Sequence, residues 1–134
     1  MSKVLSTPRS FSASPPSVVV SDKYLFRNVT LVRVVDGDTI LMVARLGFNI
    51  TREVDVRMLG INAPELHGAT NQEGAASKAY LVSLLAAGTQ LTVQTYATEK
   101  YGRYLAQVWV MVNDVWVNIN QRMIEDGYAA VFWI

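Results

Sequence analysis

The stretch Val54–Glu65, with the sequence VDVRMLGINAPE, constrains the fold of this chain more than any other. Its first half, as far as Leu59, alternates between two sets of side chains, which is the period of a β-strand with one face in a hydrophobic core. Gly60 interrupts the alternation, and Pro64 keeps the residue before it out of the helical region. We therefore expect a strand that ends in a rigid turn.

Polar groups in and after this strand are suited to a functional site. Arg57 offers a cation, Asn62 a neutral oxygen donor and Glu65 a carboxylate within a few residues. A site that binds a phosphate and a metal ion needs groups of these kinds. Taken alone, the stretch slightly favours a simpler interpretation, in which the arginine pairs with a neighbouring acid and an ordinary loop follows.

Composition limits the class of protein. With 134 residues, 51% of them hydrophobic, the chain has the length and the core material of one domain. The absence of cysteine excludes thiolate sites, and a single histidine, His67, argues against zinc. No hydrophobic run approaches the ~20 residues that span a bilayer, so no membrane partner is expected. No secretory signal is evident, and the default expectation is a cytoplasmic protein, although a secreted form without its signal would look the same.

The charge balance argues against a broad basic surface. The formal net charge is +1, from 12 basic and 11 acidic residues. Lys3 and Arg9 precede the first acid, Asp22, and without these two cations the remainder carries a net charge of −1. Counterion release from such a surface would not hold nucleic acid by itself, so a few well-placed cations or a metal ion would be required.

The order of segments begins with an arm and a hairpin. Residues 1–22 are rich in serine and contain three of the four prolines, which predicts a flexible arm before one folded domain over residues 23–134. Two β-rich segments, 29–35 and 39–44, flank Asp36-Gly37-Asp38, a strong hairpin signal. We interpret Asp36 as a turn residue, whereas the carboxylate of Asp38 could point across the sheet and bind a metal ion.

The remaining segments predict a helix, further strands and a second helix. The first helix is expected over residues 71–87, with Gly88 as its stop and with a core-facing side formed by Ala76, Tyr80, Leu81, Leu84 and Leu85. Strands are expected at 89–95, 104–112 and 115–117, with a polar loop at 97–103 between the first two. Asn118 and Gln121 can begin a last helix that ends at Gly127, before an apolar run over residues 129–134.

This order predicts a mainly β, α+β fold. A five-stranded Greek-key barrel of OB type fits it best, with one helix between strands 3 and 4 and another at the C-terminus. In such a barrel the polar groups at Asp38, Arg57, 62–65 and Arg103 could converge on one side.

Three segments resemble the signature motifs of the staphylococcal nuclease, or thermonuclease, family. They are VVDGDTI (Val34–Ile40), VRMLGINAPE (Val56–Glu65) and EKYGRYLA (Glu99–Ala106). They occur in the family's order and spacing, around a helix where that family has one, and the resemblance covers about residues 28–134. It implies a calcium-dependent nuclease, a hydrolase of phosphodiester bonds, that acts on DNA or RNA.

By motif position, the resemblance also implies a calcium site. Asp38 resembles the family's first calcium-ligand aspartate, and Asn62 falls where a second one is usual. Ala63 falls where a backbone carbonyl binds the metal ion. Asn62 departs from the family pattern, because an amide oxygen can bind calcium but carries no charge.

The resemblance implies catalytic and substrate-binding roles for five further residues. Arg57 and Arg103 match the two arginines that bind phosphate, and Glu65 matches the glutamate that positions or activates the attacking water. Lys100 and Tyr101 match residues that flank the substrate. A shallow barrel face with aromatic side chains would favour single strands.

Two other departures and two alternatives remain. Glu99 stands where an aspartate is common, and Trp133 falls near a site tyrosine of the staphylococcal enzyme. The chain could instead be a catalytically weak or inactive nucleic-acid-binding module, which Asn62 and the charge of −1 favour. It could also be a protein-interaction domain on the same barrel. The oligomeric state is left open.

Overall fold

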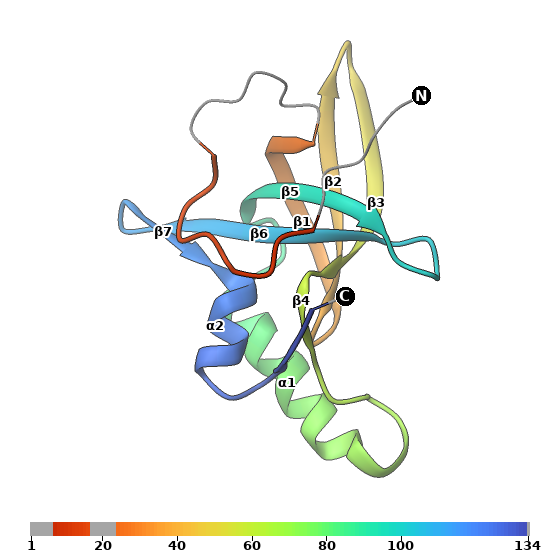
Figure 1. Cartoon of the computed structure of the whole chain (residues 1–134). Helices are drawn as coiled ribbons and strands as arrows, with labels where there is room; N and C mark the ends of the chain where they lie inside the picture. Colours follow the sequence, from red (N-terminus) through yellow and green to blue (C-terminus); the bar gives the residue numbers. More distant parts are fainter. Residues whose placement is uncertain (1–6, 17–23, 134) are drawn as a thin grey trace.

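Three long strands form a continuous antiparallel meander at the start of the barrel. They are β1 (Leu25–Asp36), β2 (Thr39–Gly47) and β3 (Ile50–Met58). Our computed structural model describes residues 7–16 and 24–133 (Figure 1). The Asp-Gly turn joins β1 to β2 as predicted, and Gly47, Phe48 and Asn49 join β2 to β3 with positive φ angles.

Two more long strands close the barrel. Strand β5 (Gln90–Thr98) pairs with β1, and β6 (Tyr104–Val112) pairs with β5 in antiparallel fashion. The start of β6 also pairs with β3 in parallel, with Leu105 opposite Arg57, while β7 (Val115–Asn118) extends the far edge of β6. The predicted five-stranded barrel of OB type is therefore confirmed.

Helices pack beside one end of the barrel (Figure 1). They are α1 (Asn71–Leu84), which follows a 3-10 turn at Gly68–Thr70, and α2 (Ile119–Glu125), which Asn118 caps as expected. Leu81 and Leu85 are buried against the barrel. The prediction that Ala76 faces the core was wrong. Ala76 is exposed, and its neighbour Ser77 is buried instead.

A second, two-stranded sheet lies beside the barrel. Its strands are β4 (Gly60–Asn62) and β8 (Ala130–Phe132), which pair antiparallel with Asn62 opposite Ala130. The sequence predicted only a turn and an apolar run at these places. The pairing fixes the end of the chain to the turn that follows β3 (Figure 1).

Residues 7–16 belong to the predicted arm and lie against the barrel. The backbone of Ser12 forms hydrogen bonds with side chains of β6 and β7. The division into an arm at 1–22 and a domain at 23–134 stays a prediction. Within the described residues, no helix has the length and apolar character needed to cross a membrane.

Candidate active site

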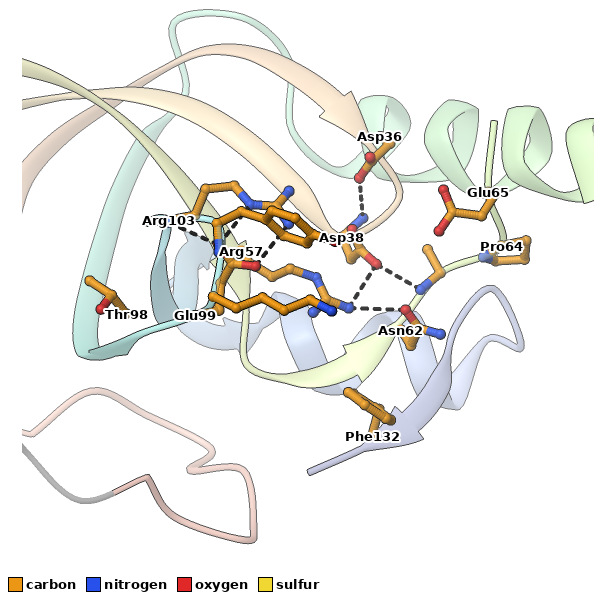
Figure 2. Close-up of a pocket in the computed structure, with 13 residues that line it drawn as sticks. Asp36, Asp38, Arg57, Asn62, Pro64, Glu65, Thr98, Glu99, Arg103 and Phe132 are labelled. Atoms are coloured by element: carbon orange, nitrogen blue, oxygen red, sulfur yellow. Dashed lines mark hydrogen bonds and ion pairs between the residues drawn. The ribbon is translucent and has the colours of Figure 1, made fainter. Parts of the chain in front are cut away.

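A pocket of about 800 Å³ opens where the starts of β2 and β6 meet the end of β3 (Figure 2). Every site residue that the sequence predicts lines this pocket, namely Asp38, Arg57, Asn62, Ala63, Glu65, Lys100, Tyr101 and Arg103. The fold therefore brings the three motifs to one place, because β2 and β6 both pair with β3. The roles of these residues remain predictions.

Asp38 is held in the pocket by three donors. Its Oδ2 accepts from the Ala63 amide at 2.9 Å and lies 3.3 Å from Nη2 of Arg57, and its Oδ1 accepts from the Thr39 hydroxyl at 3.1 Å. Burial pushes the pKa of Asp38 upward, but its hydrogen bonds with Asp36 and Ala63 and the charge of Arg57 hold it below its ordinary value. Asp38 is thus an anion fixed in one orientation.

Asp36 also lines the pocket, although the sequence analysis interpreted it only as a turn residue. It lies at the end of β1, and its Oδ1 accepts from the amide of Asp38 at 3.1 Å. Burial and the neighbouring Asp38 raise the pKa of Asp36 to about 6. Asp36 could have been identified from the sequence, because it is a second aspartate two residues before the candidate ligand Asp38.

Arg57 contacts both the acid and the turn after β3. Its Nη2 donates to Asp38 Oδ2 at 3.3 Å, to the Ile61 carbonyl at 3.2 Å and to Asn62 Oδ1 at 3.0 Å. The side chain is only 12% exposed. All three hydrogen bonds use Nη2. The Nε–H and Nη1–H groups take no part in these three bonds and can donate to an anion in the pocket.

Arg103 is held by its own loop. Glu99 accepts from Nε of Arg103 at 3.3 Å and from Nη2 at 3.1 Å, and it also accepts from the amides of Tyr101 and Arg103. Nη1 of Arg103 donates to the Thr39 hydroxyl at 3.2 Å. Hydrogen bonds from the Arg103 side chain hold the pKa of Glu99 below its ordinary value. Glu99 therefore organises the loop and orients the guanidinium group.

The rim of the pocket carries cations and exposed rings. Nζ of Lys100 lies 5.1 Å from the centre of the Tyr101 ring, and Cζ of Arg103 lies 5.8 Å from it. Tyr101 is 73% exposed. Phe132 of β8 also lines the pocket, which sequence reasoning missed, whereas Trp133 is not among the lining residues.

The turn that carries Glu65 packs closely against α1. A Cβ atom on Gly74 would lie 2.1 Å from the carbonyl oxygen of Glu65. A Cβ atom on Gly37 would lie 2.0 Å from Ser77 Oγ and 2.7 Å from Cβ of Ala63. These approaches are possible only for glycine, and they place the exposed Glu65 and the turn before it at a fixed position against the helix.

The donor atoms suit a hard cation with few charged ligands. Calcium prefers carboxylate, amide and carbonyl oxygens, and Asp36, Asp38 and Asn62 offer such oxygens in this pocket. Across residues 7–16 and 24–133, no group of three or more acidic, histidine or cysteine side chains is placed to hold an ion. The oxygens present are of a kind that calcium accepts and carry little negative charge, and calcium binding at them stays a prediction.

Comparison with known proteins connects this geometry to a family. Residues 55–134 match the family model described as staphylococcal nuclease homologue. An uncharacterized endonuclease of Escherichia coli O157:H7 and one of Escherichia coli are each 32% identical over 102 residues, which cover 76% of this chain. The chain spans 59% of the length of these relatives. An uncharacterized protein of Methanocaldococcus jannaschii is 25% identical over 157 residues, covering 91% of this chain and 73% of that protein.

Proposed function

Because the chain belongs to the family of staphylococcal nuclease homologues, we propose that it hydrolyses phosphodiester bonds of DNA or RNA with the help of calcium. The observation that carries the proposal is the shared pocket. Two arginines from separate motifs, Arg57 and Arg103, line it together with Asp38 and Glu65. Two relatives of this chain bear the name endonuclease.

The two arginines supply what a phosphodiester requires. The substrate is an anion that repels nucleophiles, and charge builds on its oxygens as phosphorus becomes five-coordinate. Guanidinium groups are planar and permanently charged, so they can grip phosphate oxygens with two parallel hydrogen bonds. Arg57 and Arg103 are both fixed in place by neighbouring acceptors, which makes them donors prepared in advance for that charge.

The acidic side of the pocket is suited to holding calcium. Asp38, Asn62 and the carbonyl of Ala63 would bind the ion, and Asp36 is close enough to Asp38 to contribute. Calcium would neutralise phosphate charge and keep a water molecule close to it. Since Asn62 adds no charge, we expect the site to need calcium at about millimolar concentration, as sites of low charge do.

Glu65 is the proposed partner of the attacking water. Its side chain is exposed and lines the same pocket as both arginines. A carboxylate there can accept a proton from the water or hold its lone pair toward phosphorus. As the water oxygen forms its bond to phosphorus, the bond from phosphorus to the leaving oxygen breaks and that oxygen takes up a proton from solvent, while Arg57 and Arg103 hold the charged phosphate.

Single strands are the proposed substrate form. Tyr101 is 73% exposed and Phe132 is 49% exposed, and both line the pocket. Exposed rings can stack on unpaired bases, and each such stack contributes about 1–3 kcal/mol. Lys100, next to Tyr101, adds a cation for the backbone.

A nucleic-acid-binding module with little or no catalysis is the second candidate. The observation in its favour is Asn62, whose Oδ1 accepts from Arg57 at 3.0 Å where the family has a charged ligand. Such a module would keep the arginines and rings for binding while failing to hold calcium.

Digestion of single-stranded DNA with calcium, with and without a chelator, separates the two candidates. We expect cleavage that the chelator abolishes, and Glu65→Gln should lower the cleavage rate by roughly 10²-fold while keeping affinity for the strand. Glu53→Gln is the matched control, because Glu53 is exposed on β3 away from the pocket lining. Binding without any cleavage would favour the module, and unchanged turnover in Glu65→Gln would remove Glu65 from the mechanism.

A further inference from the structure

Residues 7–16 lie across β6 and β7 in a way that resembles a bound peptide (Figure 1). The carbonyl of Ser12 accepts from the indole Nε1 of Trp109 at 2.8 Å and from Nδ2 of Asn118 at 2.8 Å. The amide of Ser12 donates to Oε1 of Gln107 at 3.1 Å. Both backbone polar groups of one residue, Ser12, are therefore bonded by side chains of the barrel.

The side chains that bind the backbone of Ser12 are buried. Trp109 is 0% exposed, Gln107 1% and Asn118 6%. They are also bonded to one another, since Nδ2 of Asn118 donates to Gln107 and Nε2 of Gln107 donates to the hydroxyl of Tyr96. Buried polar groups need partners, and the backbone of Ser12 supplies them to Trp109 and Asn118. With residues 7–16 in place, these side chains therefore enclose and bind the backbone of Ser12.

Phe11 adds a contact between residues 7–16 and the two-stranded sheet of β4 and β8. Its ring centre lies 4.7 Å from that of Trp133, at an interplanar angle of 40°. A Cβ atom on Gly60 would lie 2.5 Å from the Trp133 ring and 2.9 Å from the Phe11 ring. Both rings therefore rest on the backbone of the first residue of β4, and the last residue of β4 is Asn62.

The small sheet needs such support. Strands β4 and β8 have three residues each, and two-stranded ladders are marginally stable by themselves. Val131 and Phe132 of β8 are 57% and 49% exposed, so β8 buries little apolar surface of its own, whereas Ile61 anchors β4 in the core at 1% exposure. The rings of Phe11 and Trp133 cover the end of the ladder where Gly60 pairs with Phe132.

We propose that the surface formed by Trp109, Asn118, Gln107 and the β4–β8 ladder is a binding site for a short, bent peptide segment, with residues 7–16 as its ligand. Occupancy of this site holds the ladder, and with it the turn at Asn62–Ala63 and the ring of Phe132, at the edge of the pocket. Phe11 is accordingly a positioning residue. The proposal concerns the geometry of the turn and stands independently of whether the pocket cleaves nucleic acid.

Hydrogen exchange of the full chain, followed residue by residue by NMR, tests the proposal. Local opening exposes amides without unfolding the rest of a domain. In Phe11→Ala we expect exchange in β4, β8 and at the Ala63 amide to become about tenfold faster, the effect of losing an aromatic pair. Amides between β1 and β2 should keep their rates. Phe11→Tyr should restore the slow exchange, because the ring is retained.

Phe48→Ala is the matched control. Phe48 is 97% exposed at the tip of the β2–β3 hairpin, so its loss should leave the β4–β8 amides unchanged. Unchanged exchange in Phe11→Ala would overturn the proposal. Uniformly faster exchange through the whole barrel would also overturn it, because the segment would then add only general stability. Should Phe11→Ala fail to fold, the milder Phe11→Leu is read by the same two criteria.

A synthetic peptide with the sequence of residues 7–16 tests the site itself. Added to the full-length Phe11→Ala protein at about millimolar concentration, near the effective concentration of a tethered ligand, it should restore slow exchange in β4 and β8. The same peptide with alanine in place of Phe11 should not. Failure of the unaltered peptide to restore protection would show that the surface is no peptide site.

Discussion

Arg57 and Arg103 line the same pocket but are held in different ways. Arg57 bonds through one nitrogen to Asp38 and to the turn after β3, and its side chain is 12% exposed. Arg103 bonds through Nε and Nη2 to Glu99, four residues earlier in its own loop, and through Nη1 to the Thr39 hydroxyl, and its side chain is 30% exposed. One arginine therefore belongs to the proposed metal side of the pocket, and the other belongs to the rim.

Because the two arginines have different hydrogen-bond partners, a substitution at each disturbs different groups. A change at Arg57 leaves three acceptors, including the carboxylate of Asp38, without their shared donor. A change at Arg103 leaves Glu99 with the two backbone amides that it also binds. We therefore expect Arg57 to influence metal binding as well as turnover, and Arg103 to influence turnover alone.

The largest effect is expected for Arg57→Lys. Lysine keeps the charge but cannot bridge the turn and grip a phosphate together, so turnover should fall by roughly 10³-fold, the upper range for loss of one prepared donor. Calcium affinity should change as well, since Asp38 loses one of its three donors. Single-turnover cleavage beside calorimetric calcium titration measures both, with the exposed Arg52→Lys on the same strand as control. Cleavage at the wild-type rate would refute the proposed mechanism.

Arg103→Lys should have the next largest effect. Turnover is expected to fall by roughly 10²-fold through loss of the two-pronged phosphate contact, while binding of a short oligonucleotide weakens far less. Calcium affinity should stay at the wild-type value, which is the point of contrast with Arg57. A matching loss of calcium affinity in both lysine variants would mean that the two arginines are not held as differently as their contacts indicate.

Glu99→Gln should separate orientation from charge on the rim. The amide keeps one acceptor oxygen for the loop but removes the ion pair with Arg103, so turnover should drop by roughly 20-fold, within the range for residues that orient a functional group. Nucleic-acid affinity should hold steady or rise, because a negative charge leaves the rim. Equal turnover in Glu99→Gln and wild type would show that Arg103 needs no help from Glu99.

Asn62→Asp should have the smallest effect, and it acts on the metal side. The added charge is expected to tighten calcium binding by roughly tenfold, or ~1.4 kcal/mol. The gain is limited because Oδ1 of residue 62 already accepts from Arg57, and a carboxylate would hold that arginine more firmly. Calorimetric titration of both forms decides it, and identical affinities would exclude residue 62 as a ligand.

Local signals made most of the barrel predictable. The alternation through Val54–Leu59 and the Asp-Gly turn each specify a structure within a few residues, and both appear as expected. The strand pair β4–β8 was not predictable, because three-residue strands carry almost no periodic signal and their pairing depends on distant contacts. The exposure of Ala76 escaped prediction because the buried side of α1 is formed by Gly74, Ser77 and Leu81, and glycine and serine carry no hydrophobic signal.

Motif order made the composition of the pocket predictable, but not its supports. Asp36 was interpreted as a turn residue because its burial depends on how β1 bends, and the register of β1 against β2 shifts between Val34 and Asp36. The contacts of Ser12 with buried side chains could not be foreseen from a segment rich in serine and proline. The position of residues 7–16 depends on the surface of the barrel that they contact. A local sequence pattern does not predict the shape of that surface.

Because the pocket depends on the parallel contact between β3 and β6, it can form only late in the synthesis of the chain. Arg57 faces Leu105 across this contact, and the two residues lie far apart in sequence, so closing the loop between them costs entropy before any contact repays it. Synthesis proceeds from the N-terminus, and β1, β2 and β3 leave the ribosome well before β6. A nascent chain therefore carries Arg57 without Arg103 beside it. If the pocket cleaves RNA as proposed, the messenger and the ribosome that produce the chain are spared until the barrel has closed.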